Sequence, residues 1–337
     1  MSPEVKPSSG PYGGLKPEQV EAFWRDGYLI IPNALPPTTT QALLDETHTM
    51  LDDFSLDDHP MTKFSTGETS AHVGDDYFLD SGDKVRFFFE EDAFDPETGK
   101  LNKPKARAIN KIGHYLHALS PPFASLLDPA LNPDLLGAGT TGGSVEAGHK
   151  ESHPAAVGRA LGFRDPRVLQ SMVICKQPEI GGAVPPHQDS TFLYTDPPSA
   201  VGFWYALEDA TVENGCLSFL PGSHRWAPVK QRFVRAGEGK GTTFIDTDGP
   251  RFPDDKEYGE EKSNGATAET GEWRLGEVKA GSLVLIHGNL LHKSEKNLSQ
   301  KGRIIYTFHV IEGQDAKYDE RNWLQPPVGG FTSLYRA

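Results

Sequence analysis

The chain has 337 residues, which is enough for a sizeable hydrophobic core in one large domain or two smaller ones. It carries 33 Lys and Arg against 47 Asp and Glu, a net charge of −14. This balance argues against nucleic acid or an anionic membrane as the main partner, because such partners need a basic surface. The sequence has no apolar run long enough for membrane insertion and no apolar signal region at its start, so we expect a cytoplasmic, soluble protein. Cys175 and Cys216 lie in apolar segments and are predicted to pack as small hydrophobic residues without a disulfide.

The first part of the chain is predicted to form a helix, a strand and a second helix that support a sheet. Residues 1–14 are rich in Pro, Gly and Ser, and we expect a disordered tail before a single domain over 15–337. A helix is predicted from Pro17 to about Asp26, where apolar residues recur on one face. A short strand over 28–31 follows, and then a second helix over 38–54, for which Thr38, Thr39 or Thr40 is a candidate cap.

The middle of the chain mixes strand signals with polar segments. Residues 75–83 are interpreted as a polar loop and 84–89 as a buried strand. The segment 109–117 fits a strand or a helix equally well, and 168–175 is a clear strand. Between them, residues 129–155 are rich in Gly, Ser and Thr, which indicates a disordered insertion near 130–150.

The second half consists of short apolar runs separated by turn residues. These runs cover 200–207, 216–220, 282–286 and 303–310. The polar segment 237–272 is too long for an ordinary loop and is interpreted as an insertion near 240–270. We therefore predict a mostly β protein with flanking helices, built around a jelly-roll or double-stranded β-helix core of the cupin-like kind.

One short motif suggests a metal site. In His187-Gln188-Asp189 the first and last side chains would project from the same face of a strand, where an imidazole and a carboxylate bind one metal ion. A second histidine would complete the facial triad of non-haem Fe(II) enzymes. His287 and His292 both follow apolar strand residues, and their spacing alone leaves the choice between them open.

Two further residues lie in suitable positions to bind an anion. Ser294 lies two residues past His292 and would share its face on a strand. Arg303, after a predicted turn, would lie on the next strand, where its planar fork suits bidentate binding of a carboxylate.

Together these motifs resemble the phytanoyl-CoA dioxygenase family of Fe(II)/2-oxoglutarate oxygenases. The likeness includes Asn214-Gly215-Cys216-Leu217-Ser218-Phe219-Leu220-Pro221-Gly222-Ser223-His224 and extends over about residues 16–326. It implies that His187, Asp189 and His292 are the catalytic metal ligands, and that His287 is structural. It also implies that the co-substrate 2-oxoglutarate is bound by Arg303, Ser294, Lys111, Met172 and Trp204, with Gln188 between two of the metal ligands.

The resemblance implies an enzyme that uses Fe(II), 2-oxoglutarate and O2 to hydroxylate a C–H bond of a small molecule, with release of succinate and CO2. The carboxylate of Asp189 disfavours halogenation, because related halogenases lack this ligand. Two other functions remain open: a metal-dependent cupin-like isomerase or hydrolase without 2-oxoglutarate, and a catalytically silent binding protein. Arg303 and Ser294 argue against the first, and the intact triad argues against the second.

The substrate is less defined. A coenzyme A ester needs several basic groups for its phosphates. This acidic chain offers only the thin cluster Lys230, Arg232 and Arg235 and the Lys and Arg residues scattered over 84–111. The last residues also differ from the Ser-Lys-Leu peroxisomal signal. We therefore favour a free acid or another small molecule over an acyl-CoA. The sequence does not predict the oligomeric state.

Overall fold

The computed structural model describes residues 14–64, 75–128, 130–131, 152–237, 241–253 and 265–335. The predicted tail, apart from Gly14, and nearly all of the insertion near 130–150 lie outside these residues. Among the described residues, every helix is too short or too polar to cross a bilayer. Cys175 and Cys216 are both buried and free, as predicted.

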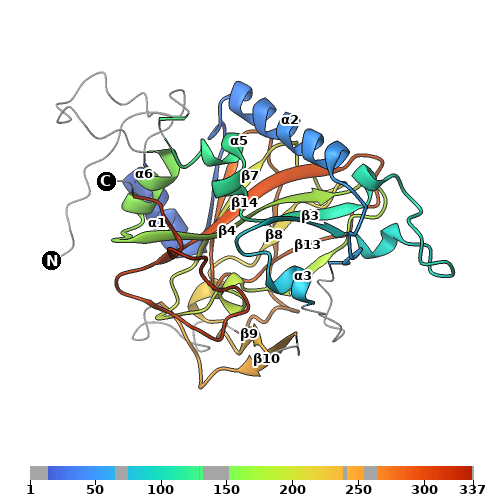
Figure 1. The fold of residues 1–337 in the computed structure, drawn as a ribbon. Helices are drawn as coiled ribbons and strands as arrows, with labels where there is room; N and C mark the ends of the chain where they lie inside the picture. The colour runs from blue at the N-terminus through green and yellow to red at the C-terminus, as the bar shows by residue number, and fades with distance from the viewer. Residues whose placement is uncertain are drawn as a thin grey trace.

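The larger of two main sheets has eight strands, and its hydrogen-bonded neighbours all run antiparallel (Figure 1). Its order is β1-β12-β7-β14-β4-β3-β2, with β16 beside β4, so strands distant in sequence lie side by side. The strands are β1 (Tyr28–Ile31), β12 (Leu283–His287), β7 (Val201–Ala206), β14 (Arg303–Glu312), β4 (Pro166–Lys176), β3 (Ile109–His114), β2 (Val85–Phe89) and β16 (Thr332–Ser333).

The smaller sheet has four strands in the order β11-β8-β13-β5. They are β11 (Arg274–Gly276), β8 (Leu217–Phe219), β13 (His292–Ser294) and β5 (Val184–His187). Two two-stranded pairs are formed by β9 (Gln231–Arg235) with β10 (Thr242–Asp246), and by β6 (Thr195–Asp196) with β15 (Lys317–Tyr318). A cavity between the two main sheets is lined by residues of both, which confirms the predicted double-stranded β-helix.

Helices flank this core. The longer ones are α1 (Pro17–Asp26), α2 (Pro37–Asp53) and α6 (His153–Ala160), and the short ones are α3 (Asp76–Leu79), α4 (Leu116–Leu119) and α5 (Pro121–Ala124). Single 3-10 turns cover η1 (Glu91–Ala93), η2 (Lys105–Arg107), η5 (Asp189–Thr191) and η6 (Ser223–Arg225). Helix α2 lies along one side of the large sheet, on the far side of the molecule from the β9–β10 hairpin (Figure 1).

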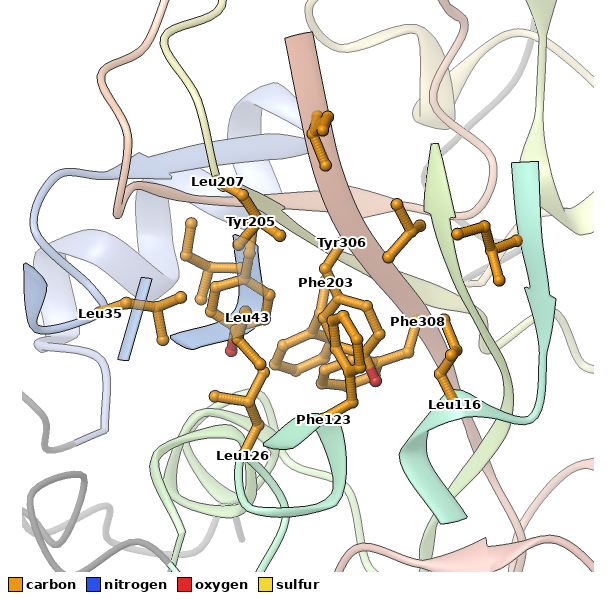
Figure 2. Packing of buried hydrophobic residues seen from close by; sticks show 14 of the residues in the cluster. Leu35, Leu43, Leu116, Phe123, Leu126, Phe203, Tyr205, Leu207, Tyr306 and Phe308 are labelled. Carbon is orange, nitrogen blue, oxygen red and sulfur yellow. The ribbon is translucent and has the colours of Figure 1, made fainter. Parts of the chain in front are cut away.

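The side chains of the large sheet divide between two environments. On β14, Tyr306 and Phe308 point into the core, where they meet Phe123 of α5 (Figure 2). The alternate residues Arg303 and Thr307 line the cavity. This alternation follows from the two-residue period of a strand. The same strands therefore support both the core and the cavity.

Several local predictions are confirmed and others are wrong. The bounds of α1 and β1 agree with the sequence pattern, whereas α2 begins at Pro37 with Pro36 as its N-cap and no side-chain cap. Instead of capping the helix, the Thr40 hydroxyl donates back to the Pro36 carbonyl. Residues 75–83 are not simply a loop, because α3 begins there with Asp75 accepting from the Phe78 amide at 2.8 Å. The ambiguous segment 109–117 is a strand to His114, followed by the start of α4.

Five histidines are buried in this framework and are poorly placed to be charged. Burial lowers the pKa of His117, His153 and His224 to about 4, and the pKa values of His114 and His287 lie well below the usual range. In the unfolded chain these groups have a pKa near 6.5. Between these values the unfolded state binds more protons than the folded state, so stability falls as the pH falls.

We predict that the free energy of unfolding decreases from pH 7 to pH 5. Each buried histidine contributes a slope of up to about 1.4 kcal/mol per pH unit below pH 6.5. Glu90 has the opposite effect on the free energy of unfolding, because burial raises its pKa to about 7. It contributes only one proton. Urea unfolding at pH 7, 6 and 5 measures the net effect, and His117→Asn should flatten the slope. Stability that is constant or rises towards pH 5 would contradict the prediction.

Candidate active site

Three side chains converge at the edge of the small sheet. His187, at the end of β5, lies opposite His292, at the start of β13, with ring centroids 4.1 Å apart. The Nε2 atoms of the two rings lie 3.5 and 3.7 Å from Oδ1 of Asp189. All three ligand atoms lie within 4.8 Å of one another, which is suitable for one metal ion.

The path of the chain at this point differs from the prediction. Strand β5 ends at His187, and Asp189 is the first residue of the 3-10 turn η5. Its carboxylate therefore reaches His187 through a turn and not through strand alternation. The other candidate, His287, ends β12 and lies against His224, with ring centroids 4.8 Å apart. It is His292, and not His287, that lies beside His187 and Asp189.

Backbone carbonyls fix the ring orientation of both histidines. Nδ1 of His187 lies 2.9 Å from the Pro185 carbonyl, and Nδ1 of His292 lies 3.0 Å from the Leu290 carbonyl. A carbonyl only accepts, so each Nδ1 carries the proton and each Nε2 keeps its lone pair. Burial, with the nearby imidazole of His187, lowers the pKa of His292 to about 4. This ring is therefore neutral at pH 7, the form that binds a metal.

The second oxygen of Asp189 has its own partner. Nε2 of His309 lies 3.2 Å from Oδ2, and the Gln170 amide approaches the other ring nitrogen at 3.5 Å. Burial opposes ionisation of Asp189, but its interactions with His292, His309 and His187 outweigh the effect of burial and hold its pKa well below the usual range. His309 thus leaves Oδ1 directed towards the two Nε2 atoms. In the sequence, the spacing of His309 from Arg303 along β14 was the signal that could have identified His309.

The triad opens into a cavity of about 1160 Å³ between the sheets. Every residue that the sequence predicted for the site lines it: Lys111, Met172, His187, Gln188, Asp189, Trp204, His292, Ser294 and Arg303. Aromatic side chains form much of the remaining wall, namely Phe64, Phe78, Phe192, Phe233, Phe244, Trp226 and Trp323. Phe233 and Phe244 belong to the β9–β10 hairpin, so the described part of the insertion near 240–270 contributes to the cavity.

Arg303 is 3% exposed and only partly satisfied. Its Nε and Nη2 both donate to the Gly215 carbonyl, at 3.0 and 2.7 Å. The guanidinium carbon lies 5.3 Å from the centre of the Trp204 ring, and Nη1 has no partner. Burial lowers its pKa to about 10, so the group stays charged at neutral pH. The Nε and Nη2 side of the guanidinium is therefore occupied by the protein, and Nη1 remains for a ligand.

Gly215 permits this arrangement. Its φ is +78°, and a Cβ atom there would lie 2.5 Å from the Glu295 carbonyl oxygen. Only glycine fits this turn without strain. The Asn214-Gly215 pair therefore presents the carbonyl that orients Arg303.

Two other residues predicted for the site, Lys111 and Gln188, contact parts of the protein other than the triad. Lys111 is buried, its Nζ lies 3.5 Å from the centre of the Phe64 ring, and burial lowers its pKa to about 7. The Gln188 amide donates to the carbonyls of Ala227 and Asn289, so it ties two loops together beside the ligands.

Sequence reasoning missed two buried charged residues that line the same cavity, Lys176 and Glu90. Lys176 follows Met172 on the inward face of β4 at a spacing of four residues, which was the available signal. One carboxylate oxygen of Glu90 accepts from the Gly182 amide, whereas the other has no partner.

The comparison with protein families decides the classification. The phytanoyl-CoA dioxygenase (PhyH) family matches residues 23–305. The chain belongs to the PhyH family. It is 40% identical over 328 residues to phytanoyl-CoA dioxygenase domain-containing protein 1 of Bos taurus, an alignment that covers 95% of this chain and 99% of the relative. It is 38% identical over 313 residues to a phytanoyl-CoA dioxygenase of Arabidopsis thaliana, with 93% and 94% covered.

Solved structures share the fold of this PhyH member. EctD from S. alaskensis with bound Fe has a TM-score of 0.52 at 19% identity and covers 92% of this chain and 80% of its own. The epimerase SnoN, in complex with Fe3+, alpha ketoglutarate and nogalamycin RO, has a TM-score of 0.53 at 14% identity and covers 94% and 98%. At these identities the likeness supports the double-stranded β-helix fold alone.

We predict that His309→Leu weakens metal binding by about 10- to 100-fold, because it frees the carboxylate of Asp189 to rotate. His309→Gln, which keeps a donor, should lose less. Equilibrium dialysis with Co(II), followed by metal analysis, measures the affinity. The exposed His48→Ala serves as a control, and equal affinity of His309→Leu and the wild type would refute a positioning role.

Proposed function

We propose that this PhyH-family chain is an Fe(II)- and 2-oxoglutarate-dependent dioxygenase that hydroxylates a C–H bond of a small molecule and releases succinate and CO2. The observation that carries the proposal is one cavity that contains both the His187, Asp189 and His292 triad and a buried guanidinium with an unpartnered nitrogen. A site that needed only a metal would have no use for that nitrogen.

The donor set fits Fe(II). Two neutral imidazoles and one carboxylate on one side of an ion form the facial triad that leaves other coordination positions open. When bound, Fe(II) and 2-oxoglutarate would supply the oxygen chemistry. The protein holds the ligands through the carbonyls of Pro185 and Leu290 and through His309.

We assign the co-substrate to the part of the cavity next to Arg303. Its Nη1 and the Ser294 hydroxyl would bind the carboxylate distant from the metal. Lys111 adds positive charge, and Met172 and Trp204 form the walls beside the carbon chain. Gln188 holds the loops around the ligands in place. The burial of Arg303 supports this assignment, because an ion pair is strongest where water is excluded.

For the primary substrate we propose a small, largely apolar molecule and not a coenzyme A ester. Much of the cavity wall is aromatic, which suits an apolar body. Two members of the thin basic cluster already bind other groups of the protein. Arg232 forms an ion pair with Asp319 at 2.8 Å, and Arg235 donates to the carbonyls of Trp323 and Leu79. Of these three residues, Lys230 is the one left to bind phosphates, and it is exposed.

We predict that anaerobic Fe(II) with 2-oxoglutarate produces a weak visible charge-transfer band in the wild-type protein. His292→Ala should abolish the band by removing a ligand. Arg303→Met should raise the Kd for 2-oxoglutarate by about tenfold or more, the range of a charged hydrogen bond. His48→Ala should leave both unchanged.

Wild-type protein without the band would remove the proposed function and favour a metal-only enzyme or a binding protein. Succinate release from 2-oxoglutarate, compared across free acids, acyl-CoA esters and neutral apolar compounds, then tests the substrate class. Stimulation by acyl-CoA esters alone would overturn the preference for a smaller substrate.

A further inference from the structure

We infer that Lys176 is a positioning residue for the co-substrate: it orients the Ser294 hydroxyl and adds a second positive charge beside the distal carboxylate of 2-oxoglutarate. This inference rests on the proposed function and extends it to a residue that the sequence did not single out.

Lys176 links the two sheets at the end of the cavity. It is the last residue of β4 and lies opposite Arg303 in the register with β14. Its Nζ donates to the Ser294 hydroxyl oxygen on β13 at 2.8 Å and to the Glu295 carbonyl. Lys176, Ser294 and Arg303 are 4%, 3% and 3% exposed. The buried ammonium therefore holds Ser294, and its residue lies on the strand next to Arg303, the other residue assigned to the carboxylate.

The direction of this hydrogen bond determines what Ser294 offers a ligand. An ammonium group only donates, so the Ser294 oxygen must accept from Lys176. The hydroxyl proton is then directed elsewhere, and the contacts of the described residues include no acceptor for it. Ser294 lines the cavity, where a carboxylate would accept this proton. Because the Gly215 carbonyl occupies Nε and one N–H of Nη2 in Arg303, the Ser294 hydroxyl would add a donor for a carboxylate with two oxygens.

The charges of Lys176 and Arg303 also favour the binding of an anion beside them. Two buried cations lie on neighbouring strands, and no carboxylate in the described part of the chain forms an ion pair with either. The nearby Glu295 side chain pairs with Lys293 instead, at 2.8 Å. Burial and the charge of Arg303 lower the pKa of Lys176 to about 7, although the charges of Glu90 and Glu295 act in the opposite direction. A bound anion would relieve this repulsion and favour the charged lysine.

The surrounding backbone encloses the lysine stem closely. A Cβ on Gly181 would lie 2.6 Å from Cγ of Lys176, and a Cβ on Gly215 would lie 2.9 Å from Cδ. Two glycines thus allow the chain to pack around an extended lysine, which fixes where its Nζ lies.

The test compares two ligands that chelate a metal in the same way. 2-Oxoglutarate has a distal carboxylate, and pyruvate lacks it. For Lys176→Met we expect the Kd of 2-oxoglutarate to rise about tenfold or more and the Kd of pyruvate to change less than twofold. Calorimetric titration of the Mn(II)-loaded, full-length protein measures both, and the exposed Lys301→Met serves as the control. Lys176→Arg should recover part of the affinity.

A second variant keeps the test independent of folding defects. If Lys176 acts through Ser294, its replacement should cost less in a Ser294→Ala background than in the wild type. Equal losses for both ligands, or unchanged 2-oxoglutarate affinity in Lys176→Met, would overturn the inference and leave the proposed function intact. Wild-type protein that binds no 2-oxoglutarate would overturn both.

Discussion

The pairing of β5 with β13 is the constraint on which the site depends. These two short antiparallel strands place His187 directly opposite His292, so backbone hydrogen bonds set the distance between two ligands. A register shift of one residue would turn one ring to the other face of the sheet. Because β13 also pairs with β8, its position is fixed from both edges. The geometry of the triad is therefore a property of the small sheet as a whole.

The large sheet adds the second half of the site through the alternation of its side chains. Strands β4, β7 and β14 each send one set of residues into the core with α2 and α5, and the other set into the cavity. A substitution on the core face of these strands would thus shift the shared backbone and change the shape of the cavity. The burial of both faces also explains why the basic side chains of Arg303 and Lys176 are almost fully enclosed.

Much of this arrangement could be predicted from the sequence. The turn residues between short apolar runs indicated the β-helix core, and the family resemblance pointed to His187, Asp189, His292 and Arg303, which line one cavity. The choice of His292 over His287 could not be made from local pattern, since both follow apolar strand residues. The 3-10 turn at Asp189 was also missed, because the His-x-Asp spacing fits a strand equally well. Lys176 and His309 were missed for another reason: their roles depend on contacts between strands far apart in sequence.

The engagement of Arg303 by a single carbonyl has a consequence for how the site would evolve. With two nitrogens held by Gly215, the guanidinium cannot swing between rotamers, and its conformational entropy is lost during folding instead of on ligand binding. A lysine at this position would have one nitrogen to serve both the loop and the ligand. The turn at Gly215 and the residue at 303 are therefore expected to be replaceable only together.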